Sequence, residues 1–271
     1  MRGHSSTCMA EYPRWVQRTS VLSNPSALAV AGIVILFIVA ETLILLQLGL
    51  FGLFVHIIVA TLILVGIQLT DDSLQLLLQS LILLPVLRLF NLGLPHFTDN
   101  DIIFLGIIYE FLLLSTWLIM RSQSVTFEDL GLVRGNLISI VPGTILGGAL
   151  GYVQYTLSLE EIQFEPSIVN YILVICIAGL LLGFIEETIF RGLIQRRLTE
   201  LIDYRLSIIV VSLLFGFMHG VWLAPLNIVF AMAVSLLLGF LYARYDDLVL
   251  ITGIHASINA TAFVLLPVYF A

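Results

Sequence analysis

Long apolar runs separated by short polar breaks fill most of the chain after residue 25. The runs cover residues 28–48, 50–69, 74–92, 102–120, 137–157, 168–187, 206–224, 226–243 and 248–268. Each run is close to the ~20 residues that an α-helix needs to cross the hydrocarbon core of a bilayer. The pattern therefore predicts an all-α, polytopic membrane helix bundle with eight or nine transmembrane helices.

For the run at 74–92, the sequence does not decide between two structures. It contains Gln75, Gln79, Pro85 and Arg88, which interrupt its apolar character. Such a segment could cross the membrane as a kinked helix or lie at the membrane interface.

Composition supports a membrane protein. Of the 271 residues, 60% are hydrophobic and only 11% are charged, whereas a soluble domain has about 25% charged residues. The formal net charge of −7 argues against a nucleic-acid partner. We therefore expect membrane lipids around the protein and no nucleic acid bound to it.

The arginines indicate an orientation. With the amino terminus in the cytoplasm and nine crossings, most of them, including Arg196 and Arg197, fall on the cytoplasmic side, and only Arg88 does not. We therefore predict a multi-pass protein of the cell membrane with a cytoplasmic amino terminus. Its single membrane unit has a tail at 1–25, amino-terminal transmembrane helices at 26–157, and carboxy-terminal helices carrying the candidate chemistry at 158–271.

Glycines recur at a spacing that favours close helix contacts. Gly143, Gly147 and Gly151 are four residues apart, as are Gly179 and Gly183. Small residues at this spacing let helix backbones approach closely in lipid. Because Gly183 lies about one turn before Glu186, a neighbouring helix can approach the face that carries the acids.

Two adjacent acids, Glu186 and Glu187, interrupt an apolar run. One acid at the centre of a membrane helix costs about 2.5–3.5 kcal/mol, so a pair calls for a reason. Glu187 has Arg191 at i+4 as an intrahelical counter-ion. Glu186, about 100° around the helix, has no such partner, so its carboxylate is the candidate for a catalytic role.

Two histidines and an amide lie in the helices that follow. If the next turn lies at Leu201–Tyr204, Glu186 and His219 are equidistant from it, so antiparallel packing sets them at the same depth. His255 and Asn259 are i and i+4 on the last helix and share one face. We expect these side chains to meet in a cavity that opens towards the cytoplasmic side.

Such a set could hydrolyse an amide in either of two ways. An acid and an imidazole can activate water as a general base, while a second imidazole and a carboxamide stabilise the oxyanion. Alternatively, Glu186, His219 and His255 could bind zinc with a position open for water, with Glu187 or Asn259 around them. The spacing does not decide between these.

Three segments together resemble a known family. They are Glu186-Glu187-Thr-Ile-Phe-Arg191, Phe215-Gly-Phe-Met-His219 and His255-Ala-Ser-Ile-Asn259. They match in order the motifs EExxxR, FxxxH and HxxxN of the CPBP or Abi family of intramembrane proteases, which includes the type II CAAX prenyl endopeptidases and bacteriocin-processing or immunity proteins. The resemblance covers residues 168–260.

The resemblance implies a role for each motif residue. Glu186 and His219 would activate water, and His255 and Asn259 would stabilise the oxyanion. Supporting roles fall to three further residues, Glu187, Arg191 and Phe215. The family is classed among metallopeptidases, and a metal-free glutamate mechanism has also been argued for it; we favour the metal-free form, in which no cofactor is required.

The resulting prediction is an intramembrane endopeptidase that cleaves a peptide or lipidated protein, for example near the carboxy terminus of a prenylated substrate. Two other classes stay open. One is a non-catalytic membrane immunity or scaffold protein, and the other is a transporter in which the same residues relay protons or cations.

Four further polar residues lie in apolar runs. Glu41 and His56 could hydrogen-bond to each other across a helix interface. For Gln154 and Asn227 we expect hydrogen bonds between helices rather than a role in the site.

Overall fold

The computed structural model describes residues 13, 15–16, 24–70, 72–94, 100–132, 137–157 and 164–270. In the amino-terminal half the helices are α1 (Asn24–Leu45), α2 (Gly49–Leu69), α3 (Asp72–Leu81), α4 (Leu83–Gly93), α5 (Asp101–Ser122) and α6 (Leu137–Thr156). One continuous helix then comprises α7 (Ile168–Val174), π-helical η1 (Ile175–Leu181), α8 (Leu182–Glu187), π-helical η2 (Thr188–Gln195) and α9 (Arg196–Thr199). The remaining elements are α10 (Tyr204–Met218), 3₁₀-helical η3 (His219–Trp222), α11 (Pro225–Tyr245), α12 (Leu248–Ala260), π-helical η4 (Thr261–Leu265) and α13 (Leu266–Phe270).

Polar residues between the apolar runs begin several of these helices. Asn100, Ser167, Asp203 and Asp247 are the N-caps of α5, α7, α10 and α12, and each side chain accepts a hydrogen bond from a backbone N–H of the first turn. The first N–H groups of a helix lack intrahelical partners, so these caps fix where each crossing starts. The polar breaks in the sequence thus set the helix boundaries.

The predicted helical membrane bundle is confirmed. Among the described residues, eight helical segments are long and apolar enough to cross a membrane, and they match eight of the nine apolar runs. The ninth run, 137–157, is covered by α6, which is not among the eight.

The segment at 74–92, for which the sequence allowed two structures, forms two helices within one apolar span. α3 ends at Leu81 and α4 starts at Leu83, and the whole span runs from Ser73 to Gly93. Pro85 lies in the first turn of α4, where its missing N–H is tolerated. The segment is therefore an interrupted helix that is long enough to cross.

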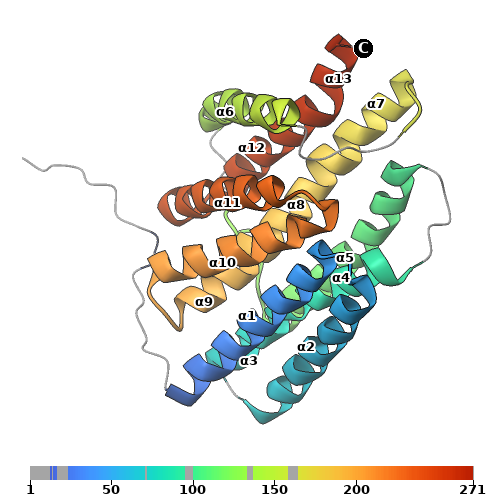
Figure 1. Ribbon diagram of the computed structural model, residues 1–271. Coiled ribbons are helices and arrows are strands. Elements are labelled where there is room, and N and C mark those ends of the chain that lie inside the picture. Colours follow the sequence, from blue (N-terminus) through green and yellow to red (C-terminus); the bar gives the residue numbers. More distant parts are fainter. Residues whose placement is uncertain are drawn as a thin grey trace, which may run out of the picture.

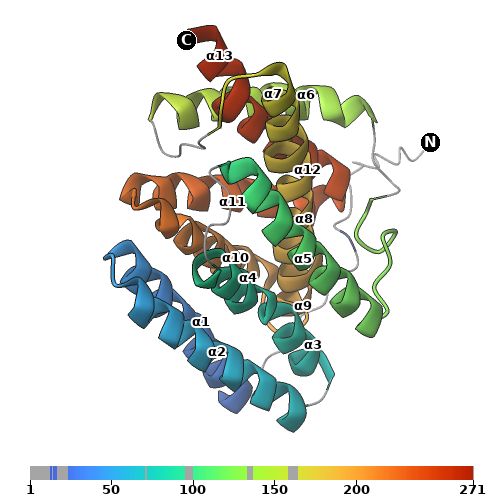
Figure 2. The ribbon, with the colours of Figure 1, turned by 90° about the vertical axis from the view of Figure 1, so that its right-hand side faces the viewer.

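The helix that carries the two acids continues well past the predicted end at 187. It extends from Ile168 to Thr199 and runs through the middle of the molecule in both views (Figures 1 and 2). The apolar pattern stops at the acids, but the helix does not, because Arg191 and Gln195 are both buried and bond to other groups inside the protein.

Glycines bring α6 against α12 as the spacing predicts. A Cβ added to Gly147 would lie 2.4 Å from the carbonyl oxygen of Ile254, and one added to Gly151 would lie 2.5 Å from that of Ile258. At Gly183, an added Cβ would lie 3.6 Å from Cγ of His255. α12 is thus held closely between α6 on one side and the helix with the acids on the other.

Loop residues gather at one end of the bundle. Trp15 Nε1 donates to Asp246 Oδ1 at 2.9 Å, which joins the amino-terminal segment to the turn between α11 and α12. Arg197 Nε donates to Gln123 Oε1 at 2.8 Å, which joins α9 to the end of α5. Nη1 of Arg196 lies 3.7 Å from Oδ1 of the same Asp246, so Arg196 and Arg197 lie at the same end as the amino-terminal segment, in agreement with the predicted distribution of arginines. Which side of the membrane this end faces stays a prediction.

Candidate active site

Glu187 is the structural member of the acid pair. It is completely buried, and its carboxylate is 3.1 Å from Nη1 of Arg191 one turn later. Arg191 also donates to Ser235 Oγ of α11 at 2.9 Å. The predicted i, i+4 pair is thus present, and it connects α8 to α11.

Glu187 has a second partner that the sequence did not predict. Its Oε1 lies 2.7 Å from Nδ1 of His255 on α12. A carboxylate at this nitrogen fixes the imidazole ring and makes Nδ1 the donor, so that Nε2 is the nitrogen presented to the cavity. Glu187 therefore orients a histidine as well as pairing with Arg191.

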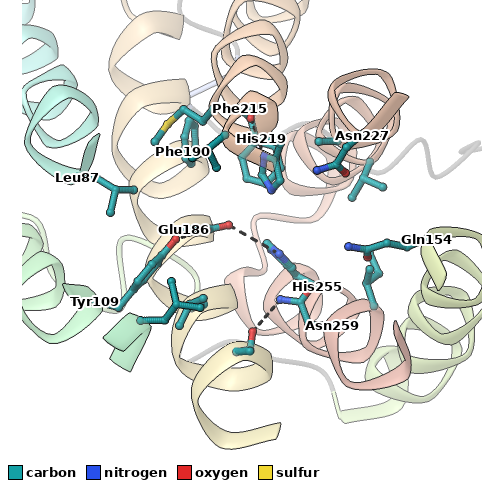
Figure 3. Close-up of a pocket in the computed structure, with 18 of the residues that line it drawn as sticks. Leu87, Tyr109, Gln154, Glu186, Phe190, Phe215, His219, Asn227, His255 and Asn259 are labelled. Atoms are coloured by element: carbon teal, nitrogen blue, oxygen red, sulfur yellow. Dashed lines mark hydrogen bonds and ion pairs between the residues drawn. The ribbon is translucent and has the colours of Figure 1, made fainter. Parts of the chain in front are cut away.

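Glu186 points to a different set of groups (Figure 3). Its Oε1 accepts a hydrogen bond from the hydroxyl of Tyr109 on α5. Its Oε2 lies 3.8 Å from Nε2 of His255. Tyr109 was absent from the sequence prediction, because it lies 77 positions from Glu186 and belongs to no motif.

His219 follows the last residue of α10, and Figure 3 shows its ring directed into the cavity that Glu186 lines. Its Nδ1 is 2.9 Å from the carbonyl oxygen of Phe215, which holds the ring against its own helix. The ring centroids of Phe215 and His219 are 4.7 Å apart, and the guanidinium of Arg191 lies 4.9 Å above the Phe215 ring. Phe215 therefore packs one turn before His219, as expected, and also contacts the structural arginine.

Asn259 donates from Nδ2 to the carbonyl oxygen of Ala178 at 2.7 Å. Ala178 belongs to η1, and π-helical turns inside longer helices are frequent at functional sites. Because a carboxamide has two N–H bonds, this contact fixes the side chain without using both of them.

One cavity brings all four predicted catalytic residues together. It has a volume of about 110 Å³ and is lined by Glu186, His219, His255 and Asn259, with Tyr109 beside them (Figure 3).

Gln154 and Asn227 also line this cavity, from α6 and α11. Both are buried at its wall, 5% and 1% exposed, and the hydrogen bonds between helices that we expected for them stay a prediction. Oε1 of Gln154 makes no hydrogen bond to any described residue. The amide oxygen of Gln154 is therefore available to a polar group in the cavity.

The side on which the cavity opens stays a prediction. Its wall includes Asn91 near the end of α4, Leu105 near the start of α5 and Val221 in η3. His219 reaches this wall because it follows the last turn of α10.

The predicted zinc ligands line one cavity, but they do not form a metal-binding group. Within the described part of the chain, no three His, Cys, Asp or Glu side chains are placed to hold a metal ion. Nδ1 of His255 is already engaged by Glu187. This contact leaves Nε2 of His255 available, as in histidines that bind zinc, so metal dependence stays a prediction, and we derive no step through a metal.

Comparison with known proteins identifies the region that contains this site. The model of the family described as type II CAAX prenyl endopeptidase Rce1-like matches residues 168–261. This part of the chain is Rce1-like. The Rce1-like segment runs from the start of α7 to the start of η4 and contains all three motifs. The resemblance predicted from the motifs is thereby confirmed for these residues.

No curated protein and no solved structure matches the chain. The Rce1-like segment supports a CAAX-type intramembrane endopeptidase as the general class, and the eight apolar helices make the chain an integral membrane protein. Tyr109, Gln154 and Arg88 line the cavity from outside the Rce1-like segment. The amino-terminal helices thus form part of the cavity wall.

Proposed function

We propose that the chain is an intramembrane endopeptidase that hydrolyses a peptide bond with water activated by Glu186 and His219. The observation that carries this proposal is the Glu186 carboxylate in a small cavity shared with two imidazoles and a carboxamide. The Rce1-like match supports the same class of reaction.

In the first step, Glu186 takes a proton from water as the water oxygen bonds to the carbonyl carbon of the substrate. Tyr109 holds Oε1 of Glu186, so Oε2 is the oxygen directed at this water. His219 accepts a hydrogen bond from the second O–H of the same water and orients it, so that only one proton is transferred in this step. The products of this step are a tetrahedral oxyanion and a protonated catalytic pair.

In the second step, the oxyanion collapses and the C–N bond breaks. The proton held by Glu186 and His219 passes to the leaving nitrogen, so the products are a new carboxyl terminus and an amine. His255, as an imidazolium, could donate from Nε2 to the oxyanion, and Asn259 could donate its second amide N–H. Donors fixed in advance, as these are by Glu187 and Ala178, are the arrangement that stabilises developing charge most effectively.

A lipidated substrate is supported by a second, apolar cavity. It has a volume of about 500 Å³ and shares α5 and α8 with the first cavity. Its wall includes Trp117, Phe127 and Phe184, whereas Ile185 and Thr188 bring it next to the acid pair. An apolar chain attached to the substrate would be held here while the peptide enters the cavity that Glu186 lines.

The experiment compares protein termini in cell membranes that contain the wild-type chain, Glu186→Gln or Glu165→Gln. Glu165 is exposed before α7 and serves as the matched control. We expect new carboxyl termini with the wild type and the control, and none with Glu186→Gln. Termini that are unchanged by Glu186→Gln would overturn the proposal and favour an immunity or scaffold role.

The same membranes test the substrate class. Synthetic peptides made with and without a prenyl chain are incubated with each preparation. A lipidated substrate predicts faster cleavage of the prenylated peptide, and equal rates would show that the apolar cavity does not select a lipid. Ion flux in proteoliposomes that is lost with Glu186→Gln would instead indicate a transporter.

A further inference from the structure

Glu41 of α1, His56 of α2 and Arg88 of α4 form a buried charged cluster in the amino-terminal helices. Their exposed fractions are 0%, 0% and 2%. Nε and Nη2 of Arg88 each donate to a different oxygen of Glu41 at 2.9 Å, and Nε2 of His56 lies 3.2 Å from Glu41 Oε1. Glu41 and His56 are therefore neighbours across the α1–α2 interface, but the geometry is not that of the hydrogen bond we predicted, and an arginine is added.

Stability alone is a weak explanation for such a cluster. Removing two charges from water costs several kcal/mol per ion, and apolar residues of similar volume are often as stabilising as a buried pair. Ionisable groups inside membrane proteins are for this reason candidates for a functional role. Arg88 was also the one arginine that did not fit the predicted topology, and its burial as an ion pair explains that exception.

Arg88 makes a third contact that leads towards the active site. Its Nη2 donates to the carbonyl oxygen of Met218, the last residue of α10, directly before His219. The last carbonyls of a helix lack intrahelical partners, and a cation there is favoured by the helix dipole. Arg88 thus holds the chain at the point where α10 gives way to His219.

α1 contacts the same segment independently. η3 packs on α1, and a Cβ added to Gly220 would lie 3.8 Å from the carbonyl oxygen of Glu41 and 3.7 Å from Cβ of Leu45. The residue after His219 therefore rests on the helix that supplies the carboxylate, while the residue before it is bonded to the arginine.

From this geometry we propose that Arg88, held by Glu41, is a positioning residue that fixes the backbone around His219. The role given to His219 rests on the proposed function. Glu41, His56 and Arg88 all lie outside the Rce1-like segment. The amino-terminal helices would therefore supply a part of the catalytic apparatus that the three motifs do not encode.

Two variants separate positioning from a purely structural role. The triple variant Glu41→Leu, His56→Leu, Arg88→Met replaces the cluster with apolar side chains, which is expected to preserve the fold. Arg88→Lys keeps the buried charge but lacks the planar fork that reaches Glu41 and Met218 together. Gln123→Met is the control, because it removes hydrogen bonds that join the end of α5 to α9 and α3, at the opposite end of the bundle.

The first readout is amide hydrogen exchange of Gly220–Leu223 in purified protein. Loss of a charge-assisted bond predicts exchange at least about tenfold faster in both test variants and unchanged in Gln123→Met. The second readout is peptide cleavage, where we expect kcat to fall at least about tenfold with KM nearly unchanged, since Arg88 fixes the catalytic group rather than the substrate.

Wild-type exchange and turnover in a folded triple variant would overturn the proposal. If the triple variant does not fold, Arg88→Lys is the deciding variant. Hydrogen exchange at the wild-type rate in Arg88→Lys would show that only the buried charge is needed, and this would overturn the proposal. Hydrogen exchange tests the positioning claim whether or not any peptide is cleaved. If the wild-type protein has no peptidase activity, the proposed function is contradicted. The hydrogen-exchange result still tests whether Arg88 positions the backbone around His219.

Discussion

At the residue scale, the two adjacent acids have separate partners. Glu187 bonds to Arg191 and His255 in the interior, whereas Glu186 faces the cavity and accepts a hydrogen bond from Tyr109. The sequence indicated this division, because only Glu187 has a cation at i+4. It could not indicate Tyr109 or the contact to His255, since both depend on how distant helices pack.

Tyr109→Phe removes only the hydroxyl that orients Glu186. We expect kcat for peptide cleavage to fall about tenfold, the equivalent of one lost hydrogen bond to a charged group. The unfolding temperature in detergent should change little, because the ring still fills its site. Tyr152→Phe, at a side chain 53% exposed on α6, is the matched control. Unchanged turnover with Tyr109→Phe would show that Glu186 needs no partner on α5.

At the element scale, glycines decide how closely α12 approaches its neighbours. The spacing of Gly143, Gly147 and Gly151 predicted a close helix contact, and the structure identifies α12 as the helix contacted. The partner could not be predicted, because a small-residue pattern carries no information about what packs against it. The extension of the acid-bearing helix to Thr199 was missed for a related reason, since partners of Arg191 and Gln195 lie on α11.

Gly147→Ala and Gly148→Ala form a matched pair on α6. A Cβ at Gly147 would lie 2.4 Å from a backbone oxygen of α12, whereas one at Gly148 would be 3.8 Å from the nearest atom, Oγ1 of Thr261. We expect Gly147→Ala to cost about 1–3 kcal/mol of stability through overpacking and to lower cleavage by displacing His255. Thermal unfolding in detergent measures this cost. Equal stability of the two variants would contradict the close packing of α6 and α12.

At the scale of the whole molecule, the helices define two ends. The amino-terminal segment, α9 and the turn before α12 gather at one end, and the cavity lies towards the other. Hydropathy predicted the crossings well, because apolar length is a strong constraint in lipid. Hydropathy could not predict which residues line the cavity, because these depend on where α10 ends and on side chains from α4, α5 and α6.

Single cysteines introduced at Glu128 and Glu165 test the two ends. Both positions are exposed, one after α5 and one before α7, and the native Cys8 and Cys176 are first replaced by serine. We expect a membrane-impermeant maleimide to label them from opposite sides of intact cells and inverted vesicles, with Glu128→Cys cytoplasmic. Labelling of both from one side would contradict the crossings, and reversed labelling would overturn the cytoplasmic amino terminus.

Cleavage of a defined peptide by purified protein in lipid vesicles tests the central claim most directly. The rates of wild-type protein, Glu186→Gln and Glu165→Gln are compared by mass spectrometry of the products, after each variant has been shown to be folded. General acid–base groups contribute about 10²–10⁴-fold, so Glu186→Gln should be at least about a hundredfold slower while Glu165→Gln matches the wild type. Cleavage by folded Glu186→Gln at the wild-type rate would contradict the account.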